Sequence, residues 1–201
     1  MKLFSYKVQY GGWPVSISMK VYQTLILSMF LMLFGCTPQD QPTDMTYTSS
    51  AAAQEALPAY VKQALHREPI ENKVEHSEEE WRKLLTKEEY FVLREEGTEP
   101  PFKNKYNDNK REGIYYCAAC HNPMFTSYTK FDSGTGWPSF YAPIAKNRIR
   151  EVADRSMGMV RTEVECARCG SHIGHVFADG PKPTGLRYCL NSAALDFEEK
   201  E

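Results

Sequence analysis

The chain has 201 residues, of which 42% are hydrophobic and 25% are charged, proportions that are ordinary for a soluble globular protein. This length suits one domain with additional segments. The formal net charge is −2, and Lys and Arg alternate with Asp and Glu without forming a basic stripe. Because phosphate binding needs a clustered basic surface, we expect no nucleic-acid partner.

An apolar run begins after Met19, in "MKVYQTLILSMFLMLFGC", and ends at Cys36. One lysine ahead of a short apolar run is typical of an export signal rather than a membrane-spanning helix. The ending resembles the bacterial lipobox, in which a cysteine after a small residue is lipidated; a plain signal peptide or membrane anchor is the alternative. We expect residues 1–36 to be an extension and lipoprotein signal peptide, with the start at Met19 and lipid on Cys36. The rest would be exported and membrane-anchored, facing the periplasm or the cell surface.

Residues 37–75 are expected to form a flexible tether. The stretch "TPQDQPTDMTYTSSAAAQ" is rich in Pro, Gln, Ser, Thr and Ala and lacks the apolar content needed to bury a core. Further along, "AYVKQALH" is compatible with a short helix. The folded domain is predicted over residues 76–198.

Two capping boxes open the predicted domain. Ser77 is followed three residues later by Glu80, and Thr86 by Glu89. In this pattern the hydroxyl and the carboxylate satisfy the free amides of a first helical turn. Two short helices are therefore predicted, the second with Gly97 as its C-cap.

Beyond residue 100 the pattern favours strands. The segments "GIYYCAAC", "MVRTEVECARC" and "GLRYCLNSAALDF" are rich in aromatic and β-branched residues, and turn signals such as "SGTG" and "ADGPKPTG" separate them. No long helical period follows. The domain is predicted to be mainly β and antiparallel.

Four of the six cysteines form two C-x-x-C pairs, Cys117 with Cys120 and Cys166 with Cys169. Two such turns can supply four thiolates to a tetrahedral zinc ion, and a site with no open position is structural rather than catalytic. Such an ion can contribute about 10–16 kcal/mol to folding. Iron in the same cage, disulfides and a redox-active pair are the alternatives.

Histidines also lie beside the cysteine pairs. His121 directly follows the first pair and His172 lies close behind the second. Either could in principle replace a cysteine as ligand, although four thiolates already complete a tetrahedron.

Cys189 has no partner nearby. If "LRYCLN" is a strand, Arg187, Cys189 and Asn191 project from the same face. A free thiol with a pKa of about 8.5 is only a few per cent ionised at neutral pH, so a nearby guanidinium would raise the reactive fraction. A lone cysteine is more often a small buried apolar residue.

Two other segments carry candidate site residues. His172 and His175 fall close together in "CGSHIGHVFADGP", and histidine is suited to protonating an oxygen near neutral pH. Trp137 lies at a Gly–Trp–Pro corner in "FDSGTGWPSF". It is either a core residue or a rigid aromatic wall for an apolar ligand group.

Five segments together resemble the B-type peptide methionine sulfoxide reductases: "WRKLLTKEEYFVLREEGTEPPF", "GIYYCAAC", "KFDSGTGWPSFY", "CARCGSHIGHVFADGP" and "GLRYCLNSAAL". The similarity extends from about residue 77 to residue 197. It implies two antiparallel sheets with short N-terminal helices, a structural zinc site of four cysteines, and reduction of the R epimer of methionine sulfoxide in oxidised proteins.

The resemblance implies a role for each matching residue. Cys189 is the nucleophile, which attacks the sulfoxide sulfur and becomes a sulfenic acid as methionine is released. Trp137 packs the terminal methyl group of the substrate. The four paired cysteines hold the zinc ion.

The polar residues around the nucleophile also match the family. His172, His175 and Asp179 correspond to the cluster that holds or protonates the sulfoxide oxygen. Arg187 and Asn191 correspond to the residues flanking the nucleophile. Spacing does not distinguish which histidine donates the proton.

One position departs from the family pattern. Many members carry a resolving cysteine where this chain has Thr135. With Cys36 lipidated and four cysteines on metal, the sulfenic acid would be reduced directly by an external thiol, either a thioredoxin-like protein or a small molecule. The competing hypotheses are a zinc-knuckled β domain acting only as a binding module and a thiol–disulfide oxidoreductase using the C-x-x-C pairs.

Overall fold

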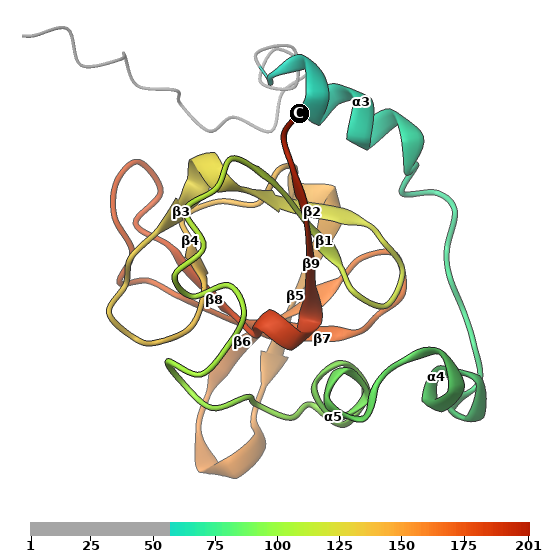
Figure 1. Cartoon of the computed structure of the whole chain (residues 1–201). Coiled ribbons are helices and arrows are strands. Elements are labelled where there is room, and N and C mark those ends of the chain that lie inside the picture. Colours follow the sequence, from blue (N-terminus) through green and yellow to red (C-terminus); the bar gives the residue numbers. More distant parts are fainter. Residues whose placement is uncertain (1–56) are drawn as a thin grey trace, which may run out of the picture. The chain divides into compact units, whose positions relative to one another are not determined.

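A computed structural model describes residues 57–201 (Figure 1). The expected signal peptide, Cys36 and most of the expected tether lie outside the described residues. None of the helices in the described part is long and apolar enough to cross a membrane.

Two antiparallel sheets form the domain. The strands of the smaller sheet are, in spatial order, β2 (Pro123–Thr126), β1 (Gly113–Cys117) and β9 (Leu195–Glu199). The strands of the larger sheet are, in spatial order, β3 (Lys130–Phe131), β4 (Ser139–Phe140), β8 (Arg187–Leu190), β7 (His172–Phe177), β6 (Arg161–Cys166) and β5 (Ile149–Asp154). Every strand pair is antiparallel. The predicted fold class is confirmed.

One apolar cluster joins the two sheets. Phe125 of β2 packs against Phe140 of β4 and Tyr188 of β8, with ring centroids 4.9 and 5.6 Å apart. Tyr188 and Leu190 are buried in this cluster. Because side chains alternate along a strand, Arg187 and Cys189 are directed to the other face of β8. The core therefore fixes which face of the larger sheet can carry the chemistry.

The two predicted capped helices are confirmed. They are α4 (Glu78–Leu84) and α5 (Lys87–Glu95), and each begins with a complete capping box. The C-terminal end of α5 differs from expectation: the left-handed residue that closes it is Glu96, with φ of 54°, and not Gly97. Gly97 is needed for space, because a Cβ there would lie 2.3 Å from the ring of Phe91.

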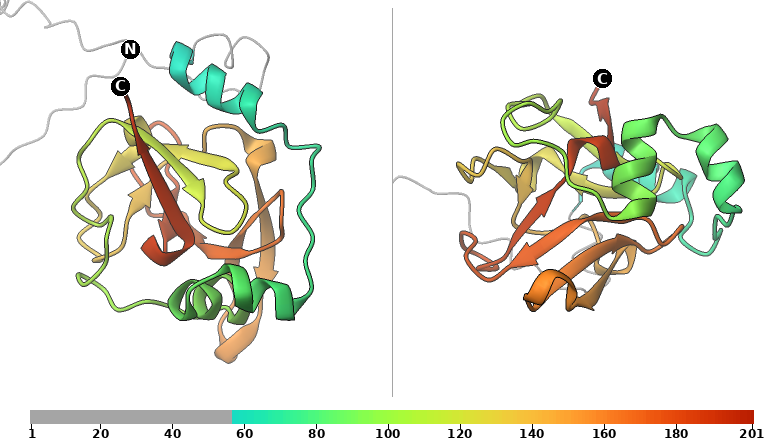
Figure 2. Two further views of the ribbon diagram at one scale, coloured as in Figure 1. Left: turned by 45° about the vertical axis from the view of Figure 1, so that its right-hand side comes forward. Right: turned by 90° about the horizontal axis from the view of Figure 1, so that it is seen from below.

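Part of the expected tether is instead packed on the domain. The segment "AYVKQALH", for which a short helix was considered, forms helix α3 (Ala59–Arg67). Its residues Val61 and Ala64 have no exposed surface. They are buried in a second apolar cluster with Ile114 and Tyr116 of β1. Figures 1 and 2 show α3 beside the C-terminal end of β9, whereas α4 and α5 lie near its beginning. The expectation of a flexible tether is therefore wrong for residues 57–75, because the helix has an apolar face that the sheet buries.

Candidate active site and metal centre

The four paired cysteines meet as predicted. Their sulfur atoms all lie within 4.8 Å of one another, with 3.7 Å between Cys117 and Cys169 and 3.5 Å between Cys120 and Cys166. A tetrahedral ion with zinc–sulfur bonds of about 2.3 Å requires sulfur separations of about 3.8 Å. None of the five cysteines in residues 57–201 forms a disulfide. The donor set and its spacing fit a structural zinc ion.

The same backbone turn presents both pairs. The carbonyl of Cys117 accepts from the N–H of His121 at 2.8 Å, and that of Cys166 accepts from the N–H of Gly170 at 2.9 Å. Both donors have a left-handed backbone, with φ of 59° and 73°. His121 therefore serves as the turn residue; its ring stacks on Tyr116 with centroids 4.2 Å apart, on the protein surface.

Two arginines bind the last turn of α3 and the residue that follows it, close to this metal centre. Arg168 donates to the carbonyl of Cys120 at 2.9 Å and to the carboxylate of Glu68 at 2.5 Å. Arg148 is buried and donates to the carbonyls of Leu65 and Glu68. We call these contacts the α3 latch. The sequence pattern gave no sign of it, because each contact joins positions about 50–100 residues apart in the chain.

Cys189 lies in a row of three side chains across the larger sheet. It is paired with Ser139 of β4 on one side and with His175 of β7 on the other. Directly opposed residues of antiparallel strands share a face. Cys189 is half-buried, so its sulfur is within reach of a ligand approaching this face.

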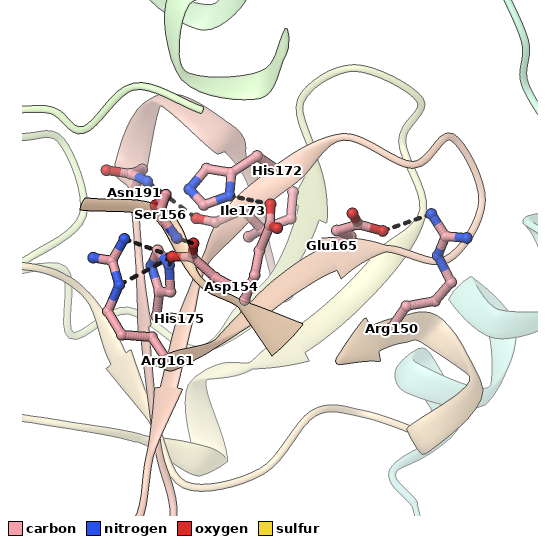
Figure 3. A network of polar contacts seen from close by, with 10 residues as sticks. Arg150, Asp154, Ser156, Arg161, Glu165, His172, Ile173, His175 and Asn191 are labelled. Atoms are coloured by element: carbon pink, nitrogen blue, oxygen red, sulfur yellow. Dashed lines mark hydrogen bonds and ion pairs between the residues drawn. The ribbon is translucent and has the colours of Figure 1, made fainter. Parts of the chain in front are cut away.

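A β-bulge brings the two histidines together. Val164 pairs with Gly174 and Glu165 with His172, so Ile173 is the extra residue on β7. Without it, residues three apart would face opposite sides of the strand. With it, the rings of His172 and His175 have centroids 5.4 Å apart (Figure 3).

Each of these histidines is held by its own carboxylate. Nδ1 of His172 lies 2.6 Å from Glu163, and Nε2 of His175 lies 2.9 Å from Asp154, which also binds Arg161 at 2.6 Å (Figure 3). Burial lowers the pKa of His175, and the bond to Asp154 partly opposes this shift. The sequence analysis identified the histidines but missed both carboxylates and Arg161.

The effect of Arg187 on the pKa of Cys189 is smaller than the effect of burial. Burial raises the pKa of Cys189, while Thr135, Arg187 and Ser139 act in the opposite direction. Arg187 makes two bonds to Asp179, at 2.9 and 2.8 Å, so its charge is shared with a carboxylate. The guanidinium therefore acts in the predicted direction, but the pKa of Cys189 stays raised because burial has the larger effect. Asp179 itself is 61% exposed.

Asn191 links the strand that carries Cys189 to two other segments. It follows the end of β8 and is buried; its amide donates to the carbonyl of Ile173 at 3.3 Å and accepts from the N–H of Glu99 at 3.2 Å. The carbonyl of Glu99 accepts from the indole of Trp137 at 3.0 Å. Asn191 therefore connects the bulge to the segment that fixes the indole.

Glu99 is a site residue that the sequence analysis missed. It is 5% exposed, and its carboxylate accepts from the N–H groups of Ser192 and Ala193 at 2.5 and 2.9 Å. These bonds cap a short 3₁₀ turn, Ser192–Ala194, which follows β8. Burial raises the pKa of Glu99. In the sequence it is one of many acids, and nothing near it distinguishes it.

Comparison with known proteins agrees with this geometry. The family model described as SelR domain matches residues 85–199. A protein of Pseudomonas fluorescens strain Pf0-1 is 57% identical over 129 residues, which cover 64% of this chain and 98% of the relative. A protein of Methanosarcina mazei is 57% identical over 131 residues, which cover 65% of this chain and 94% of the relative. Both are named peptide methionine sulfoxide reductase MsrB. The chain belongs to the MsrB family of SelR-domain proteins.

Proposed function

We propose that this chain is a peptide-methionine (R)-S-oxide reductase, with Cys189 as the nucleophile. The observation that carries the proposal is the pairing of Cys189 with His175 across β7 and β8, on the face where the bulge also brings His172. This arrangement combines a sulfur nucleophile with a proton source, which is what sulfoxide reduction requires. The similarity to the named MsrB relatives supports the same activity.

The reaction balances with these groups. The Cys189 thiolate attacks the sulfoxide sulfur, and the oxygen moves to the cysteine with one proton, which gives a sulfenic acid and methionine. We assign the proton to His175, because it lies directly opposite Cys189. Asp154 binds its Nε2, so Nδ1 is the ring nitrogen that would face the substrate. His172, held by Glu163, would bind the sulfoxide oxygen alongside it.

Trp137 would select the epimer. Its indole is fixed by the bond to Glu99 and offers a rigid apolar wall for the terminal methyl group. A fixed wall and a fixed nucleophile together define which face of the chiral sulfur meets the thiolate. Asp179 would act by orienting Arg187, and Asn191 by holding the bulge.

The test is turnover of a peptide containing methionine sulfoxide, offered as separate R and S epimers with dithiothreitol as reductant. The expected result is methionine from the R epimer only, and none with the Cys189→Ser variant. Zinc content and unfolding temperature of the variant control for folding. Equal turnover of both epimers, or of neither by a correctly folded protein, would contradict the proposal. A Cys189→Ser variant that still bound the sulfoxide peptide as tightly as the parent while neither protein turned it over would favour the binding module.

We further propose that an external thiol, from a thioredoxin-like protein or a small molecule, regenerates the enzyme. Thr135 lies at the family's resolving position, with its hydroxyl 3.9 Å from the sulfur of Cys189, and the other cysteines among residues 57–201 belong to the metal cluster. One thiol would form a mixed disulfide with the sulfenic acid and release water. A second thiol would then attack the mixed disulfide, which frees the Cys189 thiol and joins the two external thiols in a disulfide.

Mass spectrometry after one equivalent of R-sulfoxide tests this route. The parent protein should gain one oxygen atom at Cys189. The matched variant Thr135→Cys should instead lose two hydrogen atoms, because a thiol at position 135 would lie beside Cys189 and could form a disulfide with it. A stoichiometric intramolecular disulfide in the parent protein would refute direct regeneration.

Finally, we propose that the chain is a lipoprotein that repairs oxidised exported proteins under oxidative stress. The apolar run that ends at Cys36 supports this assignment. Metabolic labelling with an alkyne fatty acid in a bacterial host should label the parent and bring it to the membrane fraction. The Cys36→Ala variant should remain unlabelled. Label that persists in the variant would contradict lipidation at Cys36.

A further inference from the structure

Three hydroxyl groups form a chain that ends at the nucleophile. The hydroxyl of Thr135 lies 3.9 Å from the sulfur of Cys189, that of Ser133 lies 2.8 Å from Thr135, and that of Ser139 lies 2.7 Å from Ser133. At its far end, Ser139 donates to the carbonyl of Trp137 at 3.2 Å. Ser139 has no exposed surface, whereas Ser133 and Thr135 are half-buried.

Each hydroxyl has a single proton, which gives the chain two directions. When Cys189 is a thiol, it donates to Thr135, and the donation continues through Ser133 and Ser139 to the carbonyl of Trp137. When Cys189 is an anion, Thr135 donates to the sulfur, Ser133 to Thr135, and Ser139 to Ser133. The three hydroxyls can therefore match either state of the sulfur by rotating, with no movement of the backbone.

We infer that Thr135, Ser133 and Ser139 form a reversible hydroxyl chain that stabilises the anionic sulfur of Cys189. In turnover, which rests on the proposed function, the chain serves the attacking thiolate. Thr135 thus replaces a covalent partner of the family pattern with a hydrogen-bond donor.

The charged groups around Cys189 leave this role open. Arg187, on the same strand, is bound to Asp179. His175, on the neighbouring strand, is bound to Asp154, and Asp132 on the adjoining loop accepts from the backbone of the same loop. Arg187 and Ser139 also favour the anionic sulfur, and Thr135 adds a hydroxyl whose contact with the sulfur is 3.9 Å.

The experiment measures the rate at which iodoacetamide alkylates Cys189 as a function of pH, read from the Cys189 peptide by mass spectrometry. The Thr135→Val variant keeps the branched shape and removes the hydroxyl. Its titration should move to higher pH, and its rate at neutral pH should fall about tenfold, since a hydrogen bond to a charged group is lost. Thr135→Ser should restore the parent profile. Thr129→Val, which removes a hydroxyl bonded to a backbone carbonyl, is the matched control and should match the parent.

Ser133→Ala tests the rest of the chain, because Ser133 joins Thr135 to Ser139, whereas Ser139 also acts on the sulfur directly. It should shift the profile in the same direction as Thr135→Val by a smaller amount. A parent-like profile for Thr135→Val overturns the inference, and a shift for Thr135→Val alone reduces the chain to a single bond. Alkylation uses no sulfoxide, so a protein that follows these profiles but fails to reduce the R epimer contradicts the proposed function and leaves the hydroxyl chain intact.

Discussion

The metal centre and the Cys189 site place the same side chain in opposite surroundings within one domain. In the metal centre, four sulfurs crowd within 4.8 Å of one another, and backbone turns hold each pair. At the active site, one sulfur lies among hydroxyls and imidazoles. Crowding suits thiolates that a cation neutralises, whereas separation suits a thiolate that must attack.

The comparison shows how one protein can protect some thiols and expose another. A zinc ion bound by the four clustered sulfurs would neutralise their thiolates and so make them less reactive toward oxidant and toward Cys189. Cys189 lies outside this cluster, and burial raises its pKa although Thr135, Arg187 and Ser139 oppose the shift. Substitutions at the two sites should therefore fail in different ways.

The largest effect is expected at the metal centre. Cys166→Ser removes a ligand, and structural zinc contributes about 10–16 kcal/mol. The variant should lose its cooperative thermal transition and its zinc. Calorimetry and metal analysis measure both. Retention of a parent-like transition without metal would show that the ion is dispensable for folding.

Cys189→Ser should abolish activity and leave folding intact, in contrast to Cys166→Ser. Turnover should fall by at least about 10³-fold, because removing a nucleophile commonly costs that much. Its unfolding temperature should stay close to that of the parent, since the side chain is only half-buried. An enzyme assay and a melting curve on one sample distinguish the two sites. If Cys189→Ser lost its cooperative unfolding as Cys166→Ser is expected to, Cys189 would also be a structural residue, and the contrast between the two sites would be contradicted.

The α3 latch predicts a smaller effect on stability. Arg168→Ala removes bonds to Glu68 and to the carbonyl of Cys120, and should lower the free energy of unfolding by about 1–3 kcal/mol and speed zinc release to a chelator. Arg67→Ala is the control, because its partner Glu198 is 48% exposed and such pairs contribute about 0–1 kcal/mol. Equal effects of the two variants would show that the latch does not support the metal centre.

The smallest expected effect is a change in pH dependence. Asp154→Asn removes the bond that opposes the lowered pKa of His175, so that pKa should fall further. Because the proposed donor is the protonated ring, the alkaline limb of kcat/KM should move to lower pH, with a loss of about two- to tenfold at neutral pH. The pH profile of Glu163→Gln provides the comparison. A larger shift for Glu163→Gln would assign the proton to His172.

Local patterns predicted much of this architecture. The cysteine pairs and the capping boxes each depend on residues within a few positions of one another, and each is found as expected. The α3 latch and the carboxylates that hold His172 and His175 depend on pairings between distant segments. No local pattern contains them, because the chain must fold before these groups meet.

The bulge at Ile173 has a consequence for how the family can vary. Because one additional residue turns His172 to the same side as His175, the chemistry depends on the count of positions along β7 more than on the identity of residue 173. A conservative replacement there would leave the imidazoles where they are, whereas deletion of that position would turn one of them toward the opposite face. The number of residues in β7 thus decides whether both imidazoles lie on the side of the sheet that carries Cys189.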